Sequence, residues 1–286
     1  MSDPYHDHPA ISRSKLSEFL DSRRTYESRY VIGSEGDKED RDKLTAKAET
    51  ASMSLGTNVH GVLLEPDEYQ RRIRIVPPSA LTKSGSLVRN SDRFLDWLDE
   101  QDDGTIALKK SEADRVEAIR DAVLAEPSLR KIIESSLVVR EEPRFWTQDI
   151  DSETSIECRC KPDLLIDRGD SIQVWDIKTT NDSSERAFRS SIYKFRYWLQ
   201  DAHYSAGVFP DSVCGIDHVE FFFAAVQTSG LHPVRVYELT PADRFEASRL
   251  WMDALTDLAD CHQSGDWSDA GEGEITMLEL NLGGTR

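Results

Sequence analysis

Hydrophobic and polar positions recur along the chain with two different periods, and together they predict alternating helices and strands. Apolar residues three and four positions apart predict helices at 12–28, 52–65, 92–101, 111–125, from Pro127, at 185–206 and at 241–261. Short runs of β-branched and aromatic residues predict strands at 73–76, 138–149, 219–226 and 234–239. This order predicts an α/β (α+β) fold with a mixed central sheet flanked by helices.

The stretch Cys158–Lys178 predicts a β-hairpin around which the other elements are organised. Two strand-forming runs flank the turn residues 167–170, which include a glycine. Because side chains alternate along a strand, Asp176 and Lys178 share one face. Asp163 begins the partner strand, so we expect the turn to bring its carboxylate beside that of Asp176.

Two carboxylates and an ammonium group that meet at one point suit the hydrolysis of a phosphodiester. Carboxylate oxygens are preferred ligands of Mg²⁺ and Mn²⁺. A bound divalent ion polarises the phosphate and lowers the pKa of a bound water, and a lysine can stabilise the developing charge. The spacing alone is equally compatible with a surface hairpin that carries a cross-strand salt bridge.

Four sequence motifs occur in an order that resembles one nuclease superfamily. Lys161-Pro162-Asp163 followed by Asp176-Ile177-Lys178-Thr179-Thr180 resembles the PD-(D/E)xK signature. Ser54–His60 with Leu63–Pro66 is similar to an upstream histidine motif, Gln200–Tyr204 matches a Q-x-x-x-Y helix, and Ile11–Leu16 resembles the opening of the same domain. From about residue 11 to residue 204, the chain therefore resembles RecE-type (exodeoxyribonuclease VIII) and RecB-like phage exonucleases.

The resemblance implies a restriction-endonuclease-like core and a set of site residues. Mg²⁺ or Mn²⁺ would be held by His60, Asp163, Asp176 and the Ile177 carbonyl. Lys178, Gln200 and Glu142 would act in catalysis beside the metal. Periodicity alone would make His60 an ordinary half-buried imidazole on a helix. The upstream acid is expected at Glu142, with Glu141 as the alternative if the alignment slips by one residue.

The predicted helix 185–206 carries a second, polar face next to its apolar stripe. Aromatic rings can stack on unpaired bases, and arginines can contact phosphates. We therefore expect DNA to contact this helix through Arg186, Arg189, Tyr193, Arg196, Tyr197 and Tyr204. The alternative is an amphipathic helix whose second face is partly covered by the rest of the protein.

The charge of the 286-residue chain, −18, does not suggest a general DNA-binding protein. The imbalance is largest in residues 201–286, which hold 15 acidic and 4 basic groups. This acidity could repel DNA from unproductive surfaces, face a protein partner or confer solubility. Four irregularly spaced cysteines, no apolar run of membrane-spanning length and no signal peptide predict a cytoplasmic protein with reduced thiols and no membrane association.

We expect the chain to consist of three segments. These are a flexible tail at 1–10, a single PD-(D/E)xK nuclease domain at 11–268 with a possible mobile loop at 31–50, and an acidic C-terminal tail at 269–286. We expect a 5′–3′ double-strand DNA exonuclease of the recombination or phage type. The resemblance also implies a trimeric or tetrameric ring and a single-strand annealing protein as partner.

Two other functions stay open. One is a RecB/Cas4-like single-strand nuclease or an endonuclease of the same superfamily, although the cysteines do not follow the iron–sulfur pattern of Cas4-type relatives. The other is a catalytically inactive DNA-binding or assembly module. Such modules usually lose a metal ligand or the lysine, whereas Asp163, Asp176 and Lys178 are all present.

Overall fold

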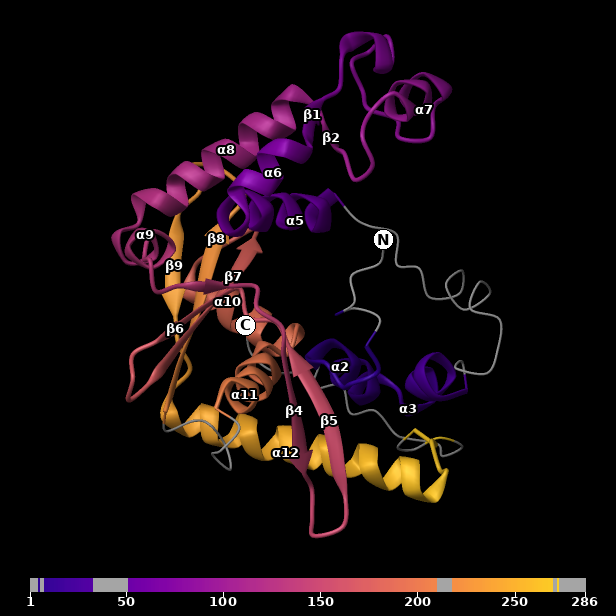
Figure 1. Cartoon of the computed structure of the whole chain (residues 1–286), viewed down its shortest axis with the longest axis vertical. Helices are drawn as coiled ribbons and strands as arrows, with labels where there is room; N and C mark the ends of the chain where they lie inside the picture. Colours follow the sequence, from indigo (N-terminus) through magenta and orange to yellow (C-terminus); the bar gives the residue numbers. More distant parts are fainter. Residues whose placement is uncertain (1–4, 6–7, 33–50, 210–217, 270–271, 273–286) are drawn as a thin grey trace, which may run out of the picture.

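The computed structural model describes residues 5, 8–32, 51–209, 218–269 and 272 (Figure 1). Of the predicted loop 31–50, only the first two residues lie in this part of the chain. Most of the predicted acidic tail also lies outside it. Among the described residues, no helix is long and apolar enough to cross a membrane.

A five-stranded mixed sheet forms the centre of the fold, as the sequence predicted. Its strand order is β3-β6-β7-β8-β9. The bounds are Val139–Arg140 for β3, Leu164–Asp167 for β6, Ile172–Thr180 for β7, Val219–Gln227 for β8 and Val234–Tyr237 for β9. In this sheet β7 and β8 pair in parallel, and the other neighbours pair antiparallel. Parallel neighbours need a crossover connection, and two helices between β7 and β8 supply it.

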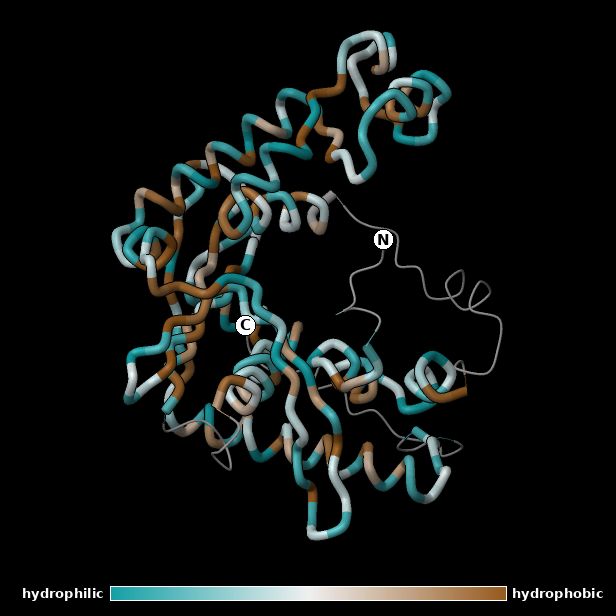
Figure 2. The backbone as a smooth tube through the Cα atoms, viewed as in Figure 1, coloured by the Kyte–Doolittle hydropathy of each residue, from teal (hydrophilic) through white to brown (hydrophobic). Residues whose placement is uncertain are grey.

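Three helices cover one face of this sheet: α5 (Ala51–Leu64), α8 (Lys110–Ala125) and α9 (Pro127–Ile133). Their apolar stripes meet the side chains that the strands direct to this face. Val59 and Ile119, for example, belong to the same buried cluster as Ile177. Hydrophobic colour accordingly follows the central strands in Figure 2, while α8 alternates between hydrophilic and hydrophobic residues.

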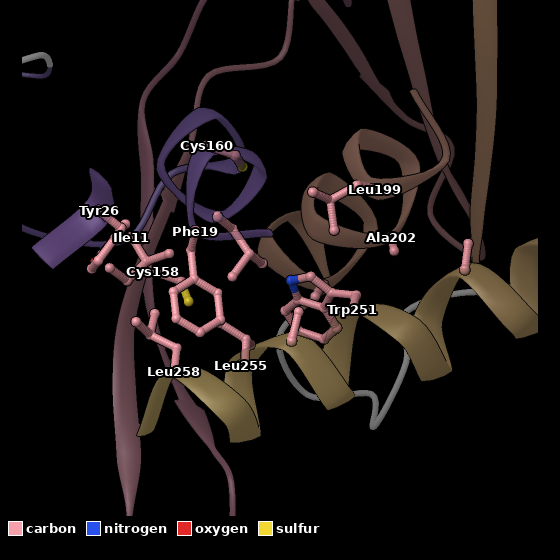
Figure 3. Close-up of a cluster of buried hydrophobic side chains, with 14 of the residues drawn as sticks. Ile11, Phe19, Tyr26, Cys158, Cys160, Leu199, Ala202, Trp251, Leu255 and Leu258 are labelled. Carbon is pink, nitrogen blue, oxygen red and sulfur yellow. The ribbon is translucent and has the colours of Figure 1, made fainter. Parts of the chain in front are cut away.

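The crossover helices α10 (Glu185–Lys194) and α11 (Tyr197–Val208) cover the other face. Beyond them, α12 (Pro241–Ser264), α2 (Arg13–Asp21), α3 (Arg23–Tyr26) and the hairpin of β4 (Arg144–Asp149) with β5 (Ser155–Cys160) enclose a further core. Figure 3 shows Phe19, Cys158 and Trp251 packed together there. The helix α11 is thus buried on both sides, between the sheet and this second core.

A smaller outlying unit precedes α8. It contains α6 (Pro66–Arg72), β1 (Ile73–Ile75), η3 (Pro78–Ala80), α7 (Asp92–Asp99) and β2 (Ile106–Leu108). The strands β1 and β2 pair in parallel, and Val76, Phe94 and Ala107 are part of a small core of their own. The sequence predicted β1 and α7 but not β2, whose three residues are too few to give a periodic pattern.

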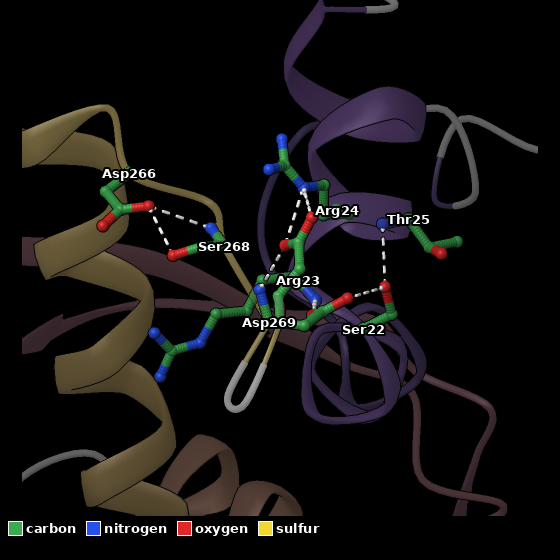
Figure 4. Close-up of polar contacts among 8 residues, drawn as sticks. Ser22, Arg23, Arg24, Thr25, Asp266, Ser268 and Asp269 are labelled. Carbon is green, nitrogen blue, oxygen red and sulfur yellow. Dashed lines mark hydrogen bonds and ion pairs between the residues drawn. The ribbon is translucent and has the colours of Figure 1, made fainter. Parts of the chain in front are cut away.

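The predicted helix 12–28 is interrupted at Ser22, which has an extended backbone with φ −164°. The Ser22 hydroxyl accepts a hydrogen bond from the Thr25 N–H and so caps α3, which continues into the π-helical turn η1 (Glu27–Val31). The start of the acidic tail supports this break, because Asp269 accepts from the Ser22 hydroxyl at 2.8 Å and from the Arg23 N–H at 2.6 Å (Figure 4).

The predicted strand 138–149 is two strands in different sheets. Glu141, between them, has a left-handed backbone with φ 46°. The strand β3 pairs with β6 in the central sheet, whereas β4 pairs with β5 in the separate hairpin. Pro143 follows in the connection and has no N–H to donate to a ladder. The chain therefore changes sheets at Glu141, directly beside the start of β6.

Candidate active site

The two carboxylates of the central hairpin lie side by side, as predicted. Leu164 of β6 pairs with Trp175 of β7, so the antiparallel register places Asp163 next to Asp176. The backbone N–H of Ile177 donates to Oδ2 of Asp163 at 2.7 Å. Both carboxylates are buried, with exposed fractions of 9% and 2%. The hairpin alone therefore brings two acidic side chains into one desolvated position.

Asp176 is contacted by both of the other polar residues predicted near it. Its Oδ1 accepts a hydrogen bond from Nε2 of Gln200 at 2.5 Å. Its Oδ2 lies 2.5 Å from Nζ of Lys178 and has no other hydrogen-bond partner in the described part of the chain. The same ammonium group lies 5.0 Å from the ring centre of Tyr197. The residue Lys178 is therefore held between a carboxylate and an aromatic face.

His60 reaches this position from α5. Its Nε2 lies 2.8 Å from the carbonyl oxygen of Ile177, and its Nδ1 lies 3.7 Å from Oδ1 of Asp163. One turn earlier, a Cβ at Gly56 would lie only 3.0 Å from the Thr179 hydroxyl. Glycine thus permits the close approach of α5 to β7 that brings the imidazole to the carboxylates.

Of the two acids that the sequence offered for the upstream position, Glu141 is the one that lies beside the site, and the predicted Glu142 faces away from it. Glu142 is exposed and forms an ion pair with Arg144 at 3.0 Å. Glu141 instead donates its N–H to the Asp163 carbonyl at 3.1 Å, and its carboxylate lies 3.7 Å from Nζ of Lys161. The left-handed backbone of Glu141 sets which of the two acids faces the site, and this conformation cannot be seen in a strand pattern.

Burial raises the pKa of Asp163, and the nearby Asp176 carboxylate raises it further. His60 and Lys178 oppose this effect. Burial also raises the pKa of Glu141, although Lys161 acts against it. Burial thus disfavours the negative charges of these carboxylates. A bound divalent cation would offset this unfavourable charge.

The residues at the site fit Mg²⁺ or Mn²⁺. Two carboxylates, the Ile177 carbonyl and the His60 imidazole supply hard oxygen donors and one nitrogen. The buried Asp176 Oδ2, whose single contact is an ammonium group, is the donor with most capacity left. Among the described residues, no three His, Cys, Asp or Glu side chains form a cluster that could by itself hold a metal ion. A bound cation would polarise a phosphate and acidify a water.

A cavity of about 600 Å³ adjoins the site. Its lining includes the acidic residues Glu65 and Glu141 beside His60, and the basic residues Arg72 and Arg89. Most of the lining residues belong to α5, α6 and β2. The cavity therefore reaches His60 and Glu141, whereas Asp163 and Asp176 are not part of its lining.

The residues predicted to bind DNA do not form one face, because helix 185–206 is broken. Arg186, Arg189 and Tyr193 are exposed on α10. Arg196 lies in the break and forms an ion pair with Asp21 at 2.7 Å. Tyr204 packs edge-on against Phe221 inside the protein. Its ring is partly buried and packs against the core, an environment that does not favour the predicted stacking on bases.

Tyr197 is also mostly covered, by Lys178 and by the rings of Phe188 and Phe223. Burial raises its pKa to about 12, so its hydroxyl stays protonated at neutral pH. Its position beside the ammonium group assigns it to the site rather than to an exposed surface. Gln200 of the Q-x-x-x-Y motif, in contrast, lies beside the site and donates to the carboxylate of Asp176.

The cysteines predicted to open the central hairpin lie instead on β5, in the separate hairpin with β4. Cys158 and Cys160 are fully buried free thiols in the core around Phe19 and Trp251. Burial raises the pKa of both, that of Cys160 to about 12. They therefore behave as small apolar side chains, while Cys214 lies outside the described residues.

The mixed sheet, with Asp163 and the Asp176-Ile177-Lys178 triplet on adjacent strands, defines the PD-(D/E)xK class of nuclease folds. Within that class, the chain belongs to the family described as PDDEXK-like domain of unknown function (DUF3799), whose family model matches residues 14–278. A comparison with curated protein sequences finds no match.

One of the solved structures similar to this chain shows the same fold. A crystal structure from Eubacterium rectale, described as that of a candidate exonuclease, has a TM-score of 0.58 and 12% sequence identity, and the match covers 100% of this chain and 98% of the other. The structure of SSO0001 matches with a TM-score of 0.29 and 13% identity over 51% of this chain and 68% of the other, which is too weak to support an argument. The first similarity indicates that the architecture extends over the whole chain.

Proposed function

We propose that this protein is a divalent-metal-dependent deoxyribonuclease that hydrolyses phosphodiester bonds. The observation that carries the proposal is the position of Lys178, whose ammonium lies 2.5 Å from a buried carboxylate that faces a second buried carboxylate. A structural salt bridge would not require Asp163 and Asp176 to be desolvated together, because their mutual repulsion costs stability.

In this proposal each residue has a separate task. Asp163, Asp176, the Ile177 carbonyl and His60 hold Mg²⁺ or Mn²⁺. Lys178 orients the attacking water and stabilises the charge that develops on the phosphate. Gln200 keeps the Asp176 carboxylate in place by its hydrogen bond to Oδ1. Glu141, near its neighbour Lys161, orders water on the side of the cavity.

The substrate we propose is duplex DNA with free ends, cut in the 5′–3′ direction by a ring of three or four copies. The support is the resemblance of four ordered motifs to RecE-type nucleases, together with an acidic chain whose exposed α10 carries basic residues. A single-strand annealing protein is the partner that this role implies, and cytoplasmic DNA is the target.

The test is digestion of linear duplex, nicked duplex, closed circular duplex and single-stranded DNA with Mg²⁺ or Mn²⁺, and with EDTA as the metal-free control. We expect linear duplex to be degraded and closed circles to resist, and sedimentation to show a trimer or tetramer. Rapid cutting of closed circles by a monomer would replace the exonuclease with an endonuclease of the same fold. Absence of cleavage on every substrate would favour a binding or assembly module.

A further inference from the structure

The long helix predicted at 185–206 is broken where no sequence feature requires it. The helix α10 ends at Lys194 and α11 begins at Tyr197. Arg196 between them has a left-handed backbone, with φ 50° and ψ 47°. Residues 185–206 contain neither glycine nor proline. A left-handed conformation is unfavourable for a residue with a Cβ, so tertiary contacts must hold this break in place.

Helix α2 supplies those contacts: it donates hydrogen bonds to the break and accepts hydrogen bonds from it. Nη2 of Arg13 donates to the carbonyl oxygens of Phe195 and Arg196, the latter at 3.2 Å. In return, Nη1 of Arg196 donates to Oδ1 of Asp21 at 2.7 Å and to the Ser17 hydroxyl at 3.2 Å. Both carbonyls at the break thus accept hydrogen bonds from a guanidinium group of another helix. We call Arg13, Arg196, Ser17 and Asp21 the α2 clamp.

The break determines where the first turn of α11 points. Tyr197, its first residue, lies beneath the Lys178 ammonium, and Gln200, three residues later, bonds Asp176. Each residue of a regular α-helix adds about 100° of rotation. If residues 195 and 196 became helical, α11 would be rotated and displaced relative to α10, and these two contacts could not both form.

Arg13 is also part of the electrostatic surroundings of the site. Its side chain is largely covered, and its Nε has no hydrogen-bond partner among the described residues. Burial lowers the pKa of Arg13, and the Asp176 carboxylate is among the groups that oppose this shift. A buried guanidinium is stabilised by a nearby negative charge, so the clamp and the site carboxylate support each other.

We propose that Arg13 and Arg196 are positioning residues, which act through the break between α10 and α11 to place Tyr197 on Lys178 and Gln200 on Asp176. This inference rests on the proposed nuclease function. It assigns a role to the Ile11–Leu16 motif, which contains Arg13 but no residue of the site itself.

Two substitutions at one position separate the backbone role of Arg196 from its side-chain contacts. Arg196→Gly removes the guanidinium but accepts a left-handed backbone without strain. Arg196→Ala removes the same contacts and keeps a Cβ, which favours straightening. We expect kcat on DNA to fall about 10- to 100-fold in Arg196→Ala and in Arg13→Ala, with KM for DNA unchanged. Arg196→Gly should retain more activity than Arg196→Ala.

Hydrogen exchange supplies a readout that does not depend on cleavage. Leu199 donates its N–H to the Arg196 carbonyl at 3.0 Å, so exchange at the start of α11 reports on the break. We expect this exchange to change in Arg13→Ala and Arg196→Ala and to remain near wild type in Arg196→Gly. The matched control is Arg249→Ala, since Arg249 is an exposed arginine on α12 whose ion pairs, with Glu246 and Asp253, lie within its own helix.

Three outcomes would overturn the inference: Arg13→Ala and Arg196→Ala with unchanged kcat and exchange, an increase in KM alone, or equal losses in Arg196→Gly and Arg196→Ala. An increase in KM alone would mean that the arginines contact DNA. If Arg13→Ala fails to fold, the comparison of glycine with alanine at position 196 still tests whether the left-handed backbone positions α11. A wild-type protein without nuclease activity would refute the proposed function, whereas the exchange experiment would still test the clamp.

Discussion

The backbone N–H of Ile177 donates to Oδ2 of Asp163 across the hairpin at 2.7 Å, while the carbonyl of the same residue faces Nε2 of His60 at 2.8 Å. The two peptide groups that flank the Ile177 Cα thus contact the Asp163 carboxylate on one side and the His60 imidazole on the other. Its side chain points the other way, into the core with Val59. The geometry of the site is therefore set by buried strand pairing, and single side chains can be changed without moving the backbone.

Asp163→Asn and Asp176→Asn should each abolish Mg²⁺-dependent cleavage without unfolding the protein. Burial raises the pKa of Asp163, so its ionised form costs stability at neutral pH and a neutral isostere relieves that cost. We expect Tm in EDTA to be unchanged or up to about 4 °C higher. Asp170→Asn, in the turn of the same hairpin, is the control. Retained digestion by either variant would show that the carboxylates are not the metal ligands.

His60→Ala should weaken Mn²⁺ binding by at least about 10-fold and raise the Mn²⁺ concentration needed for activity, because the imidazole lies beside both Asp163 and the Ile177 carbonyl. Isothermal titration with Mn²⁺ measures the affinity directly. If His60 is only a packing residue, its substitution would lower Tm and leave the metal dependence unaltered.

Glu141→Gln and Glu142→Gln form a matched pair at adjacent positions. We expect Glu141→Gln to lower kcat by at least about 10-fold, because its half-buried carboxylate lies beside Lys161 while its N–H is held by the Asp163 carbonyl. Glu142→Gln should behave as wild type, since its side chain is exposed and pairs only with Arg144. Steady-state kinetics on one DNA substrate distinguishes them, and the opposite result would reassign the acid.

Arg186→Gln and Arg189→Gln on the exposed face of α10 should weaken DNA binding and leave metal binding intact. Removing one arginine–phosphate interaction should reduce the slope of log K against log salt by about 1. Fluorescence anisotropy with labelled duplex in Ca²⁺ or EDTA measures this slope. Arg249→Gln on α12 is the control, and equal slopes in all variants would place the DNA on another surface.

The stability of the protein should fall on acidification because of a buried histidine. His203 accepts a hydrogen bond from Nε1–H of Trp251 through Nδ1 and faces the Arg159 carbonyl through Nε2. Burial lowers its pKa from 6.5 to about 4. Between these values the unfolded chain binds the proton and the folded chain does not, so the unfolding free energy should fall by roughly 2–3 kcal/mol from pH 7 to pH 4.

Urea denaturation in EDTA at several pH values measures this dependence. His203→Asn should be less stable than wild type at pH 7, because it loses the hydrogen bond with Trp251, but its stability should vary less with pH. An unchanged pH dependence in the variant would assign the acid sensitivity to other groups.

Local patterns in the sequence determined the central hairpin and which side chains lie on each of its faces. Alternation along residues 172–180 is enough to place Asp176 and Lys178 together and Ile177 in the core, because a strand has a period of two. The turn at 167–170 fixes the register that brings Asp163 to Asp176. Helix 52–65 can be predicted equally well from the sequence, since its apolar positions repeat at helical spacing and Pro66 ends it.

Only the tertiary structure decided which acid faces the site and which residues of helix 185–206 reach it. Glu141 and Arg196 both adopt left-handed backbones that no local propensity favours. Contacts with residues distant in sequence hold them there: Glu141 bonds the Asp163 carbonyl, and Arg196 binds Asp21. Such conformations depend on packing energy from the whole fold, so a periodic pattern read along the chain cannot reveal them.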